Sequence, residues 1–141
     1  MTLSLALAIL AFAAAFHAYW ALGGRIGLSV SLPERPEGGP VMPHRLGWWR
    51  PAAGGVALCL LGLALLLLAH AGQVQLPLPR WLLRYALFAA GAVLVARALV
   101  PSRYVGFFKR LRTTRWAKYD TRLYSPLILA LGLSILWEAT R

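Results

Sequence analysis

Four long apolar stretches dominate the pattern of hydrophobic and polar positions along this chain. They cover Leu3–Leu22, Ala52–Ala71, Trp81–Val100 and Leu123–Trp137. A helix rises about 1.5 Å per residue and the hydrocarbon core of a bilayer is about 30 Å thick, so a spanning helix needs about 20 apolar residues. The first three stretches reach this length, and the fourth needs polar residues from one of its flanks. The pattern therefore predicts an all-α integral membrane bundle of four transmembrane helices, with residues 1–141 forming a single domain.

The start of the fourth helix has two interpretations. Ser125 followed by Pro126 is typical of a helix start, with Ser as the N-cap and Pro in the first turn. A helix that begins there is too short to span without distorting the bilayer. Asp120 is an equally suitable N-cap, and it would leave Pro126 inside the helix, where a proline causes a kink. We expect the helix to begin at Asp120, with Ser125 as the alternative.

Basic residues are concentrated on two of the connections between the stretches. The net charge is +11, and eleven of the 15 Lys and Arg residues lie in segments 23–51 and 101–122. In a four-helix protein these two connections lie on the same side of the membrane. Cytoplasmic loops are enriched in Lys and Arg. We therefore predict a multi-pass cell-membrane protein with both termini outside and both long basic loops in the cytoplasm.

The two long connections differ in expected structure. Residues 31–43 of the first carry four prolines, which exclude a regular helix, so this part is expected to be irregular; these are Pro33, Pro36, Pro40 and Pro43. In the second, apolar side chains recur at helical spacing from Tyr104 to Leu111, with cations mostly off that face. This predicts a helix lying in the membrane surface between the third and fourth spanning helices.

The cations of this segment have two interpretations. In the first, they bind the headgroups of anionic lipids, and each contributes about 1 kcal/mol to binding. In the second, they are the ordinary positive charges that fix the topology of a membrane protein. Binding of nucleic acid is not expected, because the segment should lie against the bilayer. The candidate headgroup ligands are Lys109, Arg110, Arg112, Arg115 and Lys118.

A second candidate site is the polar cluster expected at the cytoplasmic ends of the helices. Ionisable groups within spanning helices are costly and often functional. His17 shares a helix face with Trp20 and Gly24, and Asp120 should pair with one of the nearby arginines. The predicted ligand-binding residues are His17, Trp20, Gly24, Arg97, Arg103, Asp120 and Tyr124.

Three classes of function fit these residues. The first is non-catalytic binding of a lipid or small amphipathic ligand, by a transporter, carrier or accessory subunit. The second is a membrane-embedded enzyme acting on an apolar substrate, with His17 and Asp120 as acid and base. The third is an assembly partner, in a homo-oligomer or with another membrane protein. Cys59 has no partner for a disulfide or metal site, and no metal or other cofactor is expected.

Two motifs resemble a known family. They are His17–Gly24, His-Ala-Tyr-Trp-Ala-Leu-Gly-Gly, and the stretch from Arg103–Arg110 to Tyr119–Leu127, which ends in Tyr-Asp-Thr-Arg-Leu-Tyr-Ser-Pro-Leu. The chain resembles domain-of-unknown-function family 3995, a bacterial family of small four-helix membrane proteins. The resemblance implies the same topology in a bacterial inner membrane, and it implies no activity.

Overall fold

The computed structural model describes residues 3–41 and 47–141, and its regular structure is helical. The elements are α1 (Leu3–Ala21), α2 (Leu28–Ser31), α3 (Trp49–His70), α4 (Arg80–Leu99), α5 (Arg115–Tyr119), the π-helical turn η2 (Asp120–Tyr124) and α6 (Ser125–Ala139). The last three form one continuous helix. The described residues thus contain four helices long and apolar enough to cross a membrane. The predicted all-α bundle is confirmed, and the chain is a multi-pass membrane protein.

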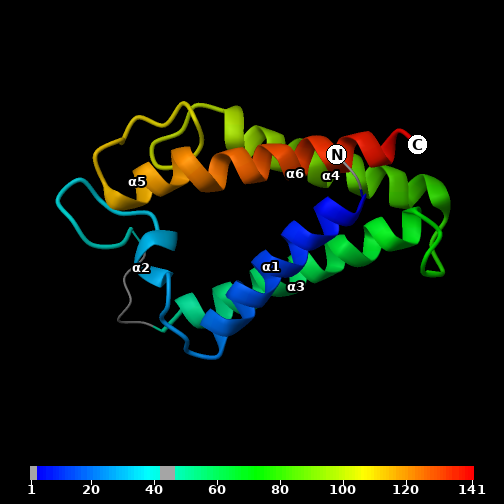
Figure 1. Ribbon diagram of the computed structural model, residues 1–141, viewed down its shortest axis with the longest axis horizontal. Coiled ribbons are helices and arrows are strands. Elements are labelled where there is room, and N and C mark those ends of the chain that lie inside the picture. Colours follow the sequence, from blue (N-terminus) through cyan, green and yellow to red (C-terminus); the bar gives the residue numbers. More distant parts are fainter. Residues whose placement is uncertain (1–2, 42–46) are drawn as a thin grey trace.

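The helices pack mainly as two pairs. The helix α1 lies along α3, and α4 lies along α6, with smaller contacts between the pairs (Figure 1). The elements α2 and α5 and the long connections gather at one end, which we call the loop end. The short turn between α3 and α4 and the C-terminus lie at the opposite end, which we call the hairpin end (Figure 1).

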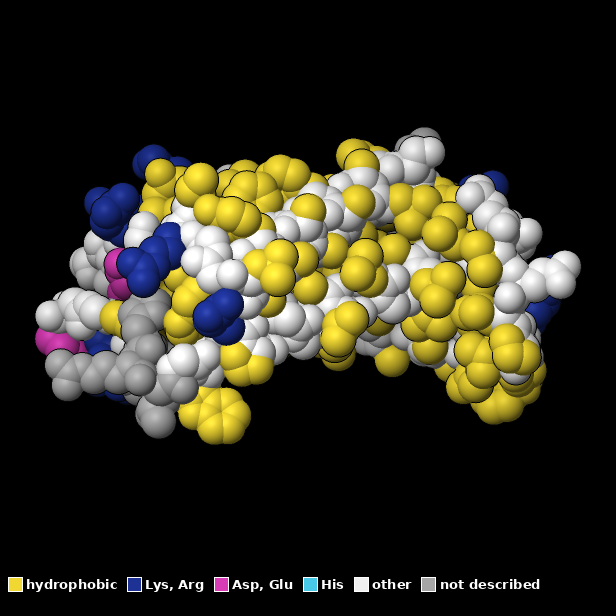
Figure 2. All heavy atoms as spheres, turned by 90° about the horizontal axis from the view of Figure 1, so that it is seen from below, with side chains coloured by type: hydrophobic (Ala, Val, Ile, Leu, Met, Phe, Trp, Pro, Cys, Tyr) yellow, Lys and Arg dark blue, Asp and Glu magenta, His cyan; other side chains and the backbone are white. Residues whose placement is uncertain are grey.

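A narrow apolar core joins the pairs. It contains Ala6, Leu10, Leu67, Leu87, Leu131, Ile135 and Ala139. Two glycines let α4 and α6 approach closely: a Cβ atom on Gly91 would lie 3.1 Å from the carbonyl oxygen of Gly132. Small residues commonly serve this purpose where membrane helices meet. Outside the core, apolar side chains cover much of the helix surface (Figure 2), as expected for helices solvated by lipid.

The end of α1 is closed by its own backbone and by α3. Gly23 has a φ of +103°, and the Gly24 amide donates to the carbonyl of Tyr19 at 2.9 Å, as in a Schellman ending. The Arg50 Nε donates to the Ala21 carbonyl at 3.1 Å, where a cation also complements the helix dipole. The helix end is therefore covered rather than open to a ligand, since the Tyr19 ring packs on Gly24.

The structure corrects two predictions about the third connection. Residues 104–111 do not form the expected surface helix. The fourth spanning helix begins at Arg115, with Thr114 as its N-cap, so neither Asp120 nor Ser125 caps it. The Thr114 side chain accepts a hydrogen bond from the Ala117 amide at 3.2 Å. Asp120 cannot act as a cap because its carboxylate bonds to other segments, as described below.

Pro126 lies inside this helix, as expected, just after the π-helical turn. The Ser125 amide donates to the carbonyl of Asp120, which lies five residues back, whereas in an α-helix the acceptor lies four residues back. A proline has no amide hydrogen and crowds the preceding turn. The wider turn at η2 accommodates it, and single π-helical turns of this kind occur frequently at functional sites.

Candidate functional site

The connection between α4 and α5 folds into a compact loop at the loop end. The Arg110 amide donates to the Ser102 carbonyl at 3.0 Å, and the Leu111 amide donates to the Arg103 carbonyl at 3.1 Å. These two bonds hold the ends of the segment side by side, as in an Ω-loop. We call Ser102–Leu111 the arginine loop. Its closure places the backbones of Arg103 and Arg110 next to each other.

A fully buried carboxylate anchors the arginine loop to the last spanning helix. Asp120 is 0% exposed. One of its oxygens accepts from the Arg97 guanidinium at 2.8 Å. The other accepts from the Lys109 ammonium at 2.9 Å and the Gly106 amide at 2.9 Å, and the Ser125 hydroxyl donates to it at 3.1 Å. Asp120 thus joins α4, the arginine loop and α6.

Lys109 belongs to this buried cluster and does not face lipid. Its ammonium donates to Asp120, to the Gly106 carbonyl at 2.9 Å and to the Thr121 hydroxyl at 2.6 Å. All three of its N–H donors are therefore used. Lys109 is 1% exposed, which corrects its assignment as a headgroup ligand. A buried cation needs these partners, because an unpaired charge in this position costs several kcal/mol.

Gly106 is required at the turn of the arginine loop. Its φ is +85°, a conformation that favours glycine. A Cβ atom there would lie 2.9 Å from the carbonyl oxygens of Arg97 and Ala98. The turn therefore packs directly on the last turn of α4.

The first long connection forms the opposite wall of this region. We call Leu32–Val41 the proline loop; its ends are joined by a hydrogen bond from the Val41 amide to the Pro33 carbonyl at 2.8 Å. As predicted, it is irregular over its described part, whereas Pro43 lies outside the described residues. Glu34 accepts from the Trp116 amide at 3.3 Å and so fastens the loop to the start of α5. Sequence analysis missed Glu34; its rarity as a carboxylate among basic loop residues was the available signal.

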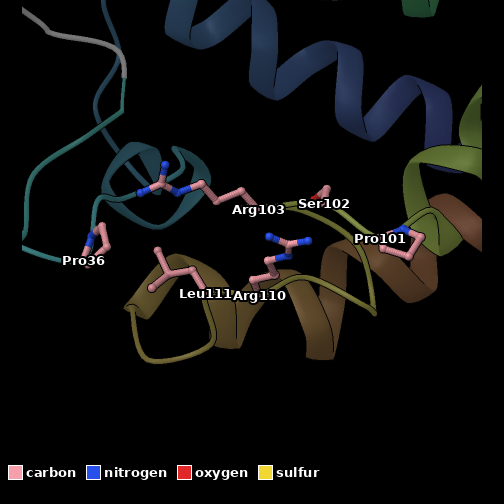
Figure 3. A pocket seen from close by; sticks show the side chains of 6 residues that line it. All are labelled: Pro36, Pro101, Ser102, Arg103, Arg110 and Leu111. Carbon is pink, nitrogen blue, oxygen red and sulfur yellow. The ribbon is translucent and has the colours of Figure 1, made fainter.

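Two adjoining hollows lie between the proline loop and the arginine loop, both open to the surface. The first, shown in Figure 3, has a volume of about 460 Å³ and is lined by Pro36, Pro101, Ser102, Arg103, Arg110 and Leu111. The second has a volume of about 340 Å³ and is lined by Leu32, Pro33, Val41, Ser102, Arg103, Tyr104 and Val105. The first hollow holds two guanidinium groups, and the second is almost wholly apolar.

Aromatic side chains pack behind Tyr104, which lines the second hollow. The Tyr124 ring stacks on that of Trp116, with centroids 5.3 Å apart. The Trp116 indole donates to the Tyr104 carbonyl at 2.9 Å, and the Arg103 guanidinium lies 5.3 Å from the centre of the Tyr104 ring. Tyr124, a predicted site residue, therefore acts here through Trp116. The structure brings Arg97, Arg103, Asp120 and Tyr124 into one region, as the sequence predicts.

The predicted residues of α1 lie apart from this cluster. His17 bonds through Nδ1 to a backbone carbonyl of its own helix at 2.8 Å. The Trp20 indole donates to the Ile26 carbonyl at 2.8 Å, and its ring forms a T-shaped contact with that of His17, with centroids 5.0 Å apart. Among the described hydrogen bonds, none joins His17 to Asp120. The geometry of an acid–base pair is therefore not formed.

The remaining cations of the third connection are exposed at the loop end. Arg112 donates to the Lys109 carbonyl at 3.2 Å, and Arg115 and Lys118 lie on the outer face of α5. Figure 2 shows Lys and Arg side chains gathered mainly at this end of the molecule. Contact of these three residues with lipid headgroups stays a prediction. Within the described residues, no group of three His, Cys, Asp or Glu side chains could hold a metal ion.

The fold and this region define a class: a four-helix multi-pass membrane protein in which the last spanning helix anchors a basic loop through a buried ion cluster. The family model described as "Protein of unknown function (DUF3995)" matches residues 10–135. The chain therefore belongs to this family, and the predicted family assignment is confirmed. No curated protein and no solved structure matches the chain.

Proposed function

We propose that this protein binds an anionic amphipathic ligand, either a membrane lipid or a smaller molecule, at the two hollows of the loop end. The observation that carries the proposal is their adjacency. A hollow with two guanidinium groups and an apolar hollow share Ser102 and Arg103. A ligand with an anionic head and an apolar portion matches both at once.

The charges of the first hollow are available to a ligand. The two ion pairs of the described residues both use Asp120, with Arg97 and Lys109 as its partners. Arg103 and Arg110 form no ion pair in the described part of the chain, and no carboxylate lines the hollow with them. A guanidinium prefers planar, bidentate contacts with carboxylate or phosphate oxygens.

The hollows lie at the level expected for lipid headgroups. The helix α4 ends at Leu99, and Pro101 already lines the first hollow. Exposed Trp48 precedes α3, and exposed Tyr119 ends α5 at the same end of the bundle. Aromatic side chains of this kind favour the membrane–water interface. By the distribution of Lys and Arg, this end faces the cytoplasm, in the inner membrane of a bacterium.

The geometry favours binding over catalysis. A general base must come within about 3 Å of the proton that it removes, directly or through one water. Asp120 is buried and accepts four hydrogen bonds, and His17 bonds within its own helix. Neither group is presented to the hollows. No observation on the described residues favours an assembly role over ligand binding.

The test compares two variants that lose the same charge. Arg103→Gln/Arg110→Gln removes both guanidinium groups of the hollow, whereas Arg115→Gln/Lys118→Gln removes two exposed cations outside it. Each protein is reconstituted in nanodiscs of zwitterionic lipid with a minor anionic lipid, and retained lipid is measured by native mass spectrometry. We expect the first variant to lose retention and the second to keep it. Equal losses would indicate a diffuse basic surface and would overturn the proposal.

A further inference from the structure

Two arginine side chains, Arg103 and Arg110, line the first hollow. The number of their guanidinium groups determines which head group they can recognise. The backbone bonds that close the arginine loop pair Ser102 with Arg110 and Arg103 with Leu111. The two arginines therefore line the same hollow from neighbouring backbone segments. Figure 3 shows the Arg110 side chain directed toward the segment of Ser102 and Arg103, and the Arg103 side chain extending from that segment toward the side of Pro36, so that the hollow lies between them.

The other polar groups around the first hollow are already engaged. The Ser102 hydroxyl bonds to both the amide and the carbonyl of Val105. The amides of Arg110 and Leu111 donate within the loop closure. Recognition of an anion here must therefore come from the two guanidinium forks.

Resting on the function proposed above, we infer that the ligand is a membrane lipid whose head is a phosphomonoester, held between Arg103 and Arg110. A terminal phosphate carries a charge of about −1.5 to −2 at neutral pH and three acceptor oxygens. Two bidentate forks require three or four oxygens. A phosphodiester head offers only two unesterified oxygens and a single charge, so it leaves donors of one fork unpaired.

The second hollow explains why the phosphate belongs to a lipid. It adjoins the first hollow through Arg103 and is lined by the apolar side chains of Leu32, Val41 and Val105. Its residues Ser102–Val105 follow the end of α4 at Leu99 by three to six positions in the chain. The part of the lipid that follows the phosphate, its glycerol and first methylene groups, fits against these side chains.

The rigid support of the arginine loop suits a selective site. Asp120 holds the loop through Gly106 and Lys109, at 2.9 Å each. Neither of these contacts involves Arg103 or Arg110. The backbone of the two arginines is therefore held in place, while their guanidinium groups form no ion pair within the described part of the chain. A backbone that is ordered before the ligand binds reduces the entropy cost of binding.

The experiment uses the full chain in zwitterionic nanodiscs that carry either phosphatidic acid or phosphatidylglycerol. Phosphatidylglycerol is added at twice the molar fraction, so that the total membrane charge is similar. Retention is measured by native mass spectrometry. We expect phosphatidic acid to bind about ten-fold more tightly, since one further charge-assisted contact corresponds to about that factor. Arg103→Gln or Arg110→Gln alone should abolish this preference, and Arg115→Gln should keep it.

The outcomes separate the two proposals. Equal binding of the two lipids overturns the phosphomonoester head and leaves anionic ligand binding standing. Retention of neither lipid overturns the phosphomonoester lipid and, with it, the membrane-lipid form of the proposed function. Inorganic phosphate at millimolar concentration distinguishes a lipid from a free anion. If it displaces phosphatidic acid, and if it raises the melting temperature in nanodiscs without anionic lipid as much as phosphatidic acid does, the occupant is free phosphate and the lipid assignment fails.

Discussion

At the scale of single residues, the buried Asp120 carboxylate accepts four hydrogen bonds and forms two ion pairs. We expect Asp120→Asn to lower the free energy of unfolding by about 3 kcal/mol or more, because it leaves buried Lys109 without its counter-charge. A melting curve in detergent measures the effect. Glu138→Gln is the matched control, since Glu138 has no ion pair among those of the described residues. An Asp120→Asn protein that melts with the wild type would show that the cluster does not depend on this charge.

His17 has the opposite character, although it is also an ionisable residue of a spanning helix. Its hydrogen bond goes to the Ala13 carbonyl, four residues back, which lies within the hydrogen-bonded backbone of α1. Loss of the imidazole therefore leaves no buried group unpaired. We expect His17→Gln to change the free energy of unfolding by less than about 1 kcal/mol and to leave lipid retention intact. If the His17→Gln protein is stable but no longer retains lipid, His17 takes part in ligand binding after all.

At the scale of elements, hydrophobic length predicts the first three spanning helices well. The stretch Leu3–Leu22 became α1 at Leu3–Ala21, and Trp81–Val100 became α4 at Arg80–Leu99. Lipid determines these helices, because a spanning segment must satisfy its backbone internally. The start of the fourth was missed because Arg115–Tyr119 is a charged turn in which only the buried Trp116 and Ala117 face inward.

The arginine loop shows why local periodicity failed. Residues 104–111 have helical spacing of apolar side chains, yet the chain turns at Gly106 and buries Lys109. The position of this lysine is decided by Asp120, which lies eleven residues away in sequence. The spacing of residues within one segment does not show which distant residue a side chain will pair with. Pairing of Asp120 with a nearby arginine was predictable from its rarity among many cations, and Arg97 fulfils it.

Gly106 provides a test of the loop as an element. We expect Gly106→Ala to cost about 2 kcal/mol, within the range for a strained backbone position, and to weaken the retention of anionic lipid. Its Cβ would meet the carbonyl oxygens of α4 at 2.9 Å and push the arginine loop away. Hydrogen exchange over residues 102–111 should rise. Gly38→Ala is the control, because Gly38 has a similar φ of +93° but no atom within 4 Å of the added Cβ. If both variants lose the same stability and lipid retention, backbone strain alone explains the effect of Gly106→Ala.

At the scale of the whole molecule, charge is distributed along the long axis. The loop end carries the arginine loop, the proline loop and the exposed cations of α5, whereas the hairpin end has few basic residues (Figure 2). The aromatic side chains Trp81, Tyr85 and Trp137 are exposed toward the hairpin end. Aromatic residues near both ends are typical of a helix bundle positioned by two membrane interfaces.

The distribution of charge predicts the orientation in the membrane. Glu37 lies exposed in the proline loop and Gln73 lies exposed in the hairpin turn, so each suits a single cysteine in a Cys59→Ser background. If the loop end is cytoplasmic, a membrane-impermeant maleimide should label Gln73→Cys in intact cells, and Glu37→Cys only after permeabilisation. Labelling of Glu37→Cys from outside would reverse the orientation. The hollows would then face the outer surface, and any lipid that binds Arg103 and Arg110 would have to come from the outer leaflet.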